Sequence, residues 1–363
     1  MCRRFSFACL SLGLLAGIVA GDAVSAEEKA GFKVHSFKVH SGCVHCFAFT
    51  ADGKLVAAGD CLRGQGVKLF DIEKQKVRAT LGGHGGGISF LAFSPDGRRL
   101  ASAVTAALQK DGSYHGELRL WDTKTGIELA MHRQTAWIHS LAFSPDGRVL
   151  AVAADEVTLW DVGKTGTLQK KAVFGGQPAQ VRVVTFSPDG KWLACAYRFE
   201  TDVLKPHGVI NIWDVRKAKN VQSMTHLNAD YWIGNGLAFS PDSRTLASSA
   251  NASIRIWDVR TGRMRMSMKA YNVLALAYSP DGKLLAASTG FGIALWETAT
   301  GRRLKAVSAP GGDNEKRCAA VAFFKDGKLV ATGAGDGMAR LWDVAGLVKQ
   351  QRKPGQRKRN RSN

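Results

Sequence analysis

The chain has 363 residues, of which 45% are hydrophobic and 22% charged, and its formal net charge is +20. This composition excludes a chain that is disordered along its whole length, and seven cysteines are too few for a fold that depends on disulfide bonds. The 40 glycines against 9 prolines indicate many tight turns, which is typical of an all-β protein.

Residues 1–26 have the order of a secretory signal peptide. Arg3 and Arg4 precede an apolar run over residues 5–20, and small residues follow as far as Ala26. The run is shorter than the roughly 20 residues of a membrane-spanning helix. We therefore expect cleavage near Ala26, no membrane span in the mature protein, and export to the periplasm or the extracellular space. An uncleaved membrane anchor is the alternative.

Two short signatures alternate along the rest of the chain. The first is an apolar strand that runs into a tight turn, usually Ser-Pro-Asp-Gly, in which proline presets φ and glycine takes the left-handed conformation that ends the turn. Its seven aspartates are Asp52, Asp96, Asp146, Asp189, Asp242, Asp281 and Asp326. We interpret them as caps of their hairpins.

The second signature is Trp-Asp, or a close variant, at the end of a strand of alternating polarity such as residues 118–121. It follows each turn, beginning in order at Phe70, Trp121, Trp160, Trp213, Trp257, Trp296 and Trp342. Each repeat is therefore predicted to contain three or four short antiparallel strands.

These paired signatures resemble the WD-repeat family over roughly residues 32–344. The resemblance implies an all-β fold: a single, monomeric, seven-bladed β-propeller of four-stranded antiparallel blades, which we assign to residues 32–345. A repeat of this family begins with the outer strand of the preceding blade. We therefore expect the amino-terminal segment 32–39 to pair with the last strand and close the ring, which leaves no open end.

The family's most regular blades share a hydrogen-bonded network of His, Ser or Thr, Asp and Trp. The His place is filled only by His40 and His84, and the Asp place, six residues before the tryptophan, only by Asp336. No blade holds the full set. We expect apolar packing between blades to supply most of the stability.

Blades 2 and 4 carry extra residues between their second and third strands, at about 104–117 and 197–209. The resemblance places both segments, expected as loops, on the rim where family members commonly bind partners. We interpret this rim as a partner-binding surface because exposed aromatic and cationic side chains dominate many interfaces. The alternative is that the aromatics pack beneath the loops. The candidate residues are Trp137, Tyr231, Trp232, Tyr271, Tyr114, Arg198, Phe199 and Lys205.

No catalytic, cofactor or metal site is expected. Cys43 and Cys46 lie three residues apart in a predicted strand, so their side chains point to opposite faces and do not share a tetrahedral ion. A disfavoured reading is a metal held across the rim by His115 and His207 with Glu117 or Asp202.

Residues 346–363 contain seven Lys or Arg and no acid, which predicts a disordered basic tail. We interpret the whole as a non-enzymatic scaffold that recognises a protein or peptide partner on the rim. Two alternatives stay open. One is a propeller enzyme with its site in the central funnel, and the other is a polyanion binder acting through the tail, whose affinity would fall steeply with salt.

Overall fold

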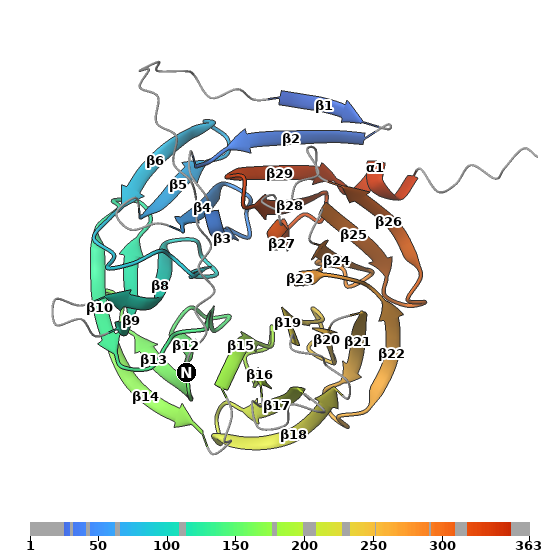
Figure 1. Ribbon diagram of the computed structural model, residues 1–363. Coiled ribbons are helices and arrows are strands. Elements are labelled where there is room, and N and C mark those ends of the chain that lie inside the picture. Colours follow the sequence, from blue (N-terminus) through green and yellow to red (C-terminus); the bar gives the residue numbers. More distant parts are fainter. Residues whose placement is uncertain are drawn as a thin grey trace, which may run out of the picture.

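The computed structural model describes residues 25–29, 32–40, 44–61, 66–108, 114–175, 180–198, 208–226, 233–250, 252–289, 292–308 and 318–349. Seven antiparallel sheets stand radially around one axis (Figure 1). The predicted seven-bladed propeller is confirmed. The segments predicted as signal peptide and basic tail lie almost entirely outside the described residues.

Blades 1 to 6 each consist of four consecutive strands, which follow one another from the axis outwards. Blade 1 comprises β3 (Val44–Phe49), β4 (Leu55–Asp60), β5 (Val67–Asp71) and β6 (Lys76–Leu81). Blade 2 comprises β7 (Phe90–Phe93), β8 (Arg99–Leu108), β9 (Tyr114–Asp122) and β10 (Glu128–Gln134). Blade 3 comprises β11 (Ser140–Phe143), β12 (Val149–Ala153), β13 (Val157–Val162) and β14 (Leu168–Phe174). Blade 4 comprises β15 (Gln180–Phe186), β16 (Trp192–Arg198), β17 (Gly208–Asp214) and β18 (Lys219–His226). Blade 5 comprises β19 (Ile233–Phe239), β20 (Thr245–Ala250), β21 (Ser253–Asp258) and β22 (Met264–Lys269). Blade 6 comprises β23 (Val273–Tyr278), β24 (Leu284–Thr289), β25 (Gly292–Glu297) and β26 (Arg303–Ser308).

Blade 7 joins the two ends of the chain. It contains β27 (Cys318–Phe323), β28 (Leu329–Ala334) and β29 (Met338–Asp343), and β2 (Phe32–Lys38) pairs antiparallel with β29. This pairing confirms the predicted closure. The sequence did not predict β1 (Ser25–Lys29), which adds a fifth strand outside β2 (Figure 1). It also did not predict α1 (Val344–Lys349), which crosses the expected boundary between propeller and tail.

Six of the seven turns are held by the same two hydrogen bonds, as the blade 6 turn shows, whereas the blade 7 turn has Phe324 in place of the hydroxyl residue and its Asp326 accepts the Lys328 backbone N–H alone among the described residues. The Ser279 hydroxyl donates to Asp281 Oδ1 over 2.6 Å, and the same carboxylate oxygen accepts the Lys283 backbone N–H at 3.0 Å. The serine bond, followed by the Lys283 N–H, holds the pKa of Asp281 below its usual value. The aspartate therefore caps its hairpin, as the sequence predicts.

The blade 5 turn keeps both hydrogen bonds but has Ser243 where the other six turns have glycine. Ser243 adopts the left-handed conformation, with φ of 60°, which costs a non-glycine residue free energy. Its hydroxyl accepts the backbone N–H of Asp189, in the neighbouring blade, at 3.1 Å. This bond between blades offsets part of the backbone strain.

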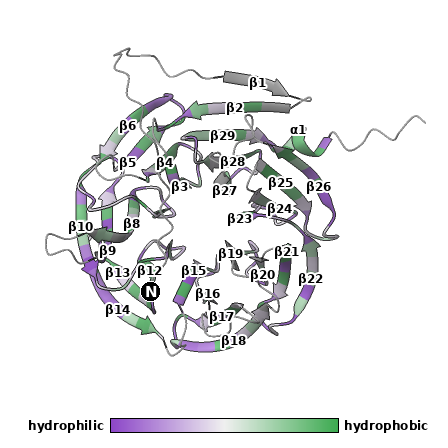
Figure 2. Ribbon diagram, viewed as in Figure 1, coloured by the Kyte–Doolittle hydropathy of each residue, from purple (hydrophilic) through white to green (hydrophobic). Residues whose placement is uncertain are grey.

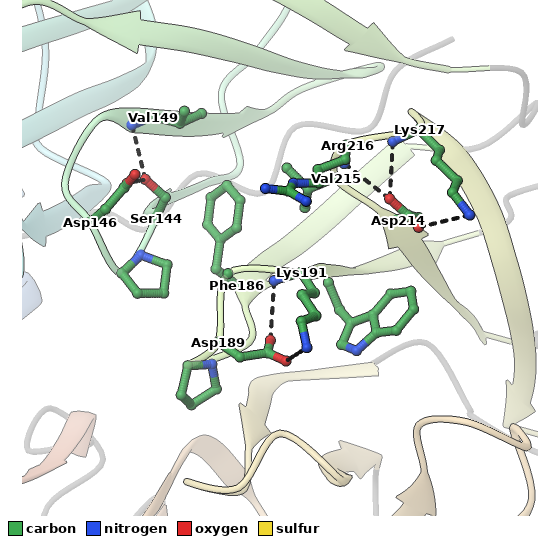
Figure 3. A pocket seen from close by; sticks show the side chains of 14 residues that line it. Ser144, Asp146, Val149, Phe186, Asp189, Lys191, Asp214, Val215, Arg216 and Lys217 are labelled. Carbon is green, nitrogen blue, oxygen red and sulfur yellow. Dashed lines mark hydrogen bonds and ion pairs between the residues drawn. The ribbon is translucent and has the colours of Figure 1, made fainter.

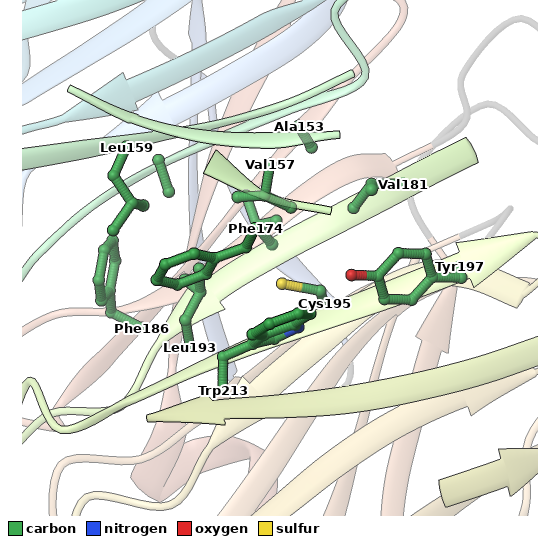
Figure 4. Packing of buried hydrophobic residues seen from close by; sticks show 12 residues of the cluster. Ala153, Val157, Leu159, Phe174, Val181, Phe186, Leu193, Cys195, Tyr197 and Trp213 are labelled. Carbon is green, nitrogen blue, oxygen red and sulfur yellow. The ribbon is translucent and has the colours of Figure 1, made fainter. Parts of the chain in front are cut away.

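Apolar side chains between neighbouring blades form the core. Between blades 3 and 4, for example, Phe174 stacks on Trp213 with ring centroids 5.1 Å apart, and both are buried (Figure 4). Leu193 and Val157 pack in the same cluster and are fully buried. Burial of this kind stabilises by about 25 cal/mol for each Å² removed from water. Packing between blades is therefore a main source of stability.

The polar network of the family survives in part. Trp121 Nε1 donates to Ser102 Oγ at 2.8 Å, and His84 Nε2 lies 2.8 Å from the same oxygen. The tryptophan bond is also present in blades 5 and 7, where Trp257 donates to Ser248 and Trp342 to Thr332. In blade 4 a buried cysteine, Cys195, occupies the corresponding place, and the hydroxyl of Tyr197 points towards it (Figure 4).

Replacing Ser102 by Ala is expected to destabilise the protein by about 2 kcal/mol, because both a buried indole N–H and a buried imidazole lose their partner. Urea unfolding followed by tryptophan fluorescence measures the change. Ser288→Ala is the matched control: Ser288 is also fully buried in the second strand of a blade but bonds no tryptophan. Equal costs for the two variants would show that the network adds nothing.

Candidate functional site

The meander of each blade defines two rims. The upper rim carries the connections between blades and the hairpins between second and third strands, whereas the lower rim carries the Asp-Gly turns and the Trp-Asp turns. The rim predicted to bind partners is the upper one.

Trp137 lies on the upper rim, in the connection from β10 to β11. Its side chain is 52% exposed, while its neighbour Ile138 is fully buried. Thr105 of β8 donates its hydroxyl to the Ile138 carbonyl at 3.0 Å, which ties this connection to blade 2. A large aromatic side chain is thus exposed on a fixed backbone, an arrangement typical of interface anchors.

Tyr271 is 67% exposed and lies in the corresponding connection from β22 to β23. It is three blades away from Trp137, so a ligand that contacts both must span the mouth of the channel. The structure does not describe the side chains of the remaining rim candidates: Tyr114, Arg198, Phe199, Lys205, Tyr231 and Trp232.

The extra residues of blade 2 form a hairpin extension instead of a loop. β8 has ten residues and β9 nine, against four to seven in most other strands, and pairing continues as far as Leu108 with Tyr114. The expectation of a loop from residue 104 is therefore wrong, because strand pairing resumes at Ala107 and Leu108 after an irregularity that follows Val104. Residues 109–113 and the blade 4 tip, 199–207, lie outside the described residues.

Two polar residues that sequence reasoning missed lie beside Trp137. His139 is 6% exposed and lies directly before β11, and its Nδ1 is 3.4 Å from Nη1 of Arg182 in β15. Burial, followed by the charge of Arg182, lowers the pKa of His139 to about 4, although Asp155 opposes the shift. The histidine is therefore neutral at physiological pH. In the sequence, His139 directly follows the apolar residue Ile138 at the entry to an inner strand, and this position was the signal that could have identified it.

A buried ionic cluster supports blade 2 below the same rim. Arg119 Nε donates to Oε1 of the fully buried Glu117 at 2.6 Å and also pairs with Glu128. Arg133 lies 3.6 Å from the second Glu117 oxygen. Burial, followed by the charge of Arg119, lowers the pKa of the adjacent His84 to about 4. Glu117 is engaged by two arginines, which leaves it unsuited to ligate a metal.

The lower rim has a cavity of about 600 Å³ between blades 3 and 4 (Figure 3). Its walls include Phe186, Trp192 and the turns of both blades. Its acids hold the turns: Asp189 accepts the Lys191 N–H at 3.1 Å, and Asp214 accepts the Lys217 N–H at 3.0 Å. We therefore regard this cavity as part of the turn architecture.

Across the part of the chain that the structure describes, no group of three or more His, Cys, Asp or Glu side chains is placed to hold a metal ion. His207, Asp202 and Cys43 lie outside that part. Burial raises the pKa of the Cys46 thiol. No helix among the described residues is long and apolar enough to cross a membrane.

The strands form a closed seven-bladed propeller with Trp137 exposed on its upper rim. The model of the family described as "WD domain, G-beta repeat" matches residues 31–71, 75–122, 126–161, 168–214, 220–258 and 311–343. The chain belongs to this WD40 repeat family. The matched segments leave out blade 6, whose four strands the structure nevertheless contains.

The chain is similar to several curated proteins at low identity. It is 28% identical to the small ribosomal subunit protein RACK1y of Oryza sativa subsp. japonica, over 48% of this chain and 49% of that protein. It is 25% identical to periodic tryptophan protein 2 of Arabidopsis thaliana over 64% of this chain and 24% of that protein. It is 31% identical to a U3 small nucleolar RNA-associated protein 15 homolog of Xenopus laevis, over 28% of this chain and 18% of that protein. The chain thus spans half or less of these relatives.

These relatives show that our expectation of export was wrong. Proteins named for the small ribosomal subunit and for U3 small nucleolar RNA are not exported proteins. The expectation rested on the order of Arg3 and Arg4, the apolar run over residues 5–20 and the small residues as far as Ala26, and that pattern does not by itself show that a segment is an export signal. Of the predicted signal segment, the structure describes only Ser25 and Ala26, which begin β1.

Proposed function

We propose that this protein is a non-enzymatic scaffold that binds a protein or peptide partner on its upper rim. The observation that carries the proposal is the 52% exposure of Trp137 on a connection held by Thr105 and the buried Ile138. Indole side chains exposed on rigid backbone lose little conformational entropy on binding, which favours them as anchors. Membership of the WD40 repeat family supports a binding role.

The extended hairpin of blade 2 supports this choice of surface. It stands next to Trp137: a β-carbon at Gly116 would lie 3.0 Å from Cγ1 of Ile138. The hairpin lengthens the wall beside the aromatic anchor. We propose that a partner lies between this wall and the channel mouth, where it reaches Tyr271 if it is long enough.

Trp137→Ala is expected to reduce partner affinity at least tenfold, because truncating an anchor residue at an interface commonly costs about 2 kcal/mol or more. Full-length tagged protein captures partners from a lysate, and quantitative mass spectrometry compares the captured sets. The matched control is Ile127→Ala, since Ile127 is 61% exposed but lies in a lower-rim turn. A captured set that is the same for wild type and Trp137→Ala would remove the upper rim as the binding surface.

A further inference from the structure

The outer circumference of the propeller is strongly basic. The six outermost strands of blades 1 to 6 contain ten Lys or Arg residues and a single acid, Glu128, which pairs with Arg119. The cations are Lys76, Arg78, Arg133, Lys170, Lys171, Lys219, Arg265, Lys269, Arg303 and Lys305. Figure 2 shows the hydrophilic residues of these strands along the outside of the ring.

On the outer side of blades 5 and 6, few acidic residues balance this excess of positive charge. Between residues 259 and 308 the chain has eight Lys or Arg and two acids, Asp281 and Glu297. Asp281 pairs with Lys283 at 3.6 Å on the lower rim, and Glu297 pairs with Arg302 at 3.8 Å. Acids therefore leave most of the positive charge on this side of the molecule exposed.

Three exposed cations on this side form no ion pair with the described residues: Arg263, Lys269 and Arg303. Arg265 shares their surface and is held by Asp258, whose pKa falls to about 2 chiefly through that bond. Arg263 lies directly before β22 and Lys269 is the last residue of that strand, so these cations are spread along the whole outer edge of blade 5.

Packing makes blades 5 and 6 one continuous surface. Gly301, in the turn before β26, lies against β22, since a β-carbon there would lie 3.2 Å from Cγ of Met268. Beyond β26, the fully buried Leu347 of α1 packs in one cluster with Leu304 (Figure 1). The described part of the chain ends at Lys349, in α1, and in the sequence residues 350–363 contain six cations and no acid.

We propose that the outer edges of blades 5 and 6 bind the phosphodiester backbone of a single-stranded nucleic acid. This surface, the basic arc, consists of Arg263, Arg265, Lys269, Arg303 and Lys305. A flexible polyanion follows a convex surface and releases counterions wherever a cation replaces them. A bilayer is close to flat on this scale and meets only part of the arc. Lys269 ends β22 two residues before Tyr271 of the upper rim, whereas Arg263 and Arg303 lie at the other ends of β22 and β26, beside the Trp-Asp turns.

The test measures binding of the full-length protein to a fluorescein-labelled oligouridylate of about 20 nucleotides by anisotropy across a series of salt concentrations. The arc variant carries Arg263→Glu, Lys269→Glu and Arg303→Glu. The matched control makes the same change in net charge on the lower rim, through Lys191→Glu, Lys217→Glu and Lys283→Glu. These lysines are also exposed, and each pairs with an aspartate of its own turn.

We expect the arc variant to lose at least tenfold in affinity and the slope of log K against log salt to flatten by about 2, because three phosphate contacts disappear. The affinity of the control variant for the oligonucleotide should stay within about threefold of the wild-type affinity. If charge reversal unfolds the arc variant, the set R263Q, K269Q and R303Q provides the measurement, with a smaller loss of the same sign.

Four results would overturn the proposal. The first is a wild-type protein that does not bind the oligonucleotide, and the second is an equal loss of affinity in the arc and control variants, which would indicate net charge alone. The third is loss of binding on deletion of residues 350–363 while the arc variant keeps it, which would assign the binding to those residues. The fourth is binding only to vesicles that contain phosphatidylserine. In each case the outer cations would serve to keep free strand edges from pairing with other chains.

Discussion

Ser36→Pro is expected to destabilise the whole propeller by more than about 3 kcal/mol, because it interrupts the strand that closes the ring. Ser36 is buried in β2 and pairs with Arg340 of β29 on one side and with Ser25 of β1 on the other. Proline removes a ladder N–H and clashes in the interior of a sheet. Phe37, next to it, packs on Phe70 with ring centroids 5.9 Å apart, so displacement of β2 also disturbs blade 1.

Urea unfolding and thermal melting measure this effect. Glu27→Pro is the matched control, since Glu27 lies in β1, outside the closed ring, and pairs only with Val34. We expect Glu27→Pro to lower the free energy of unfolding by only a small part of the loss caused by Ser36→Pro. Similar losses for the two variants would mean that closure through β2 and β29 does not hold the ring together.

The second large effect is a loss of stability between about pH 6.5 and pH 4. Folding lowers the pKa of His84 and of His139 to about 4, so the unfolded chain binds more protons in this interval. Stability is therefore fully present above the unfolded pKa of about 6.5 and falls with pH until the folded pKa is reached, by up to about 3 kcal/mol for each histidine. Burial is the main cause at both sites.

Neighbouring charges set the remainder of both shifts. Arg119 disfavours the imidazolium of His84 while Glu117 favours it, and Arg182 and Asp155 act in the same opposing ways on His139. The double variant His84→Gln and His139→Gln should flatten the slope of unfolding free energy against pH.

His45→Gln, at an exposed histidine, is the control and should keep the wild-type slope. An unchanged slope in the double variant would assign the acid sensitivity to other groups, such as the carboxylates of the turns. The pKa values of these carboxylates are also lowered, so their contribution to the stability of the protein is lost at more acidic pH.

Local sequence patterns determined the repeat architecture. The Ser-Pro-Asp-Gly turns and the alternating strands before each Trp-Asp act over a few residues, so they predict seven blades, including blade 6, which the family match leaves out. The segment 32–39 could be assigned to the closing strand because a repeat begins one strand before its own blade.

The tertiary structure alone decided which polar groups meet. Glu117 and Arg119 form a buried cluster with Glu128 of the next strand, and His139 meets Arg182 of the next blade. Such pairs are separated by up to 43 residues, and their energy depends on burial that only the closed ring creates. For the same reason the pairing of β1 and the docking of α1 follow from surfaces that no local pattern encodes.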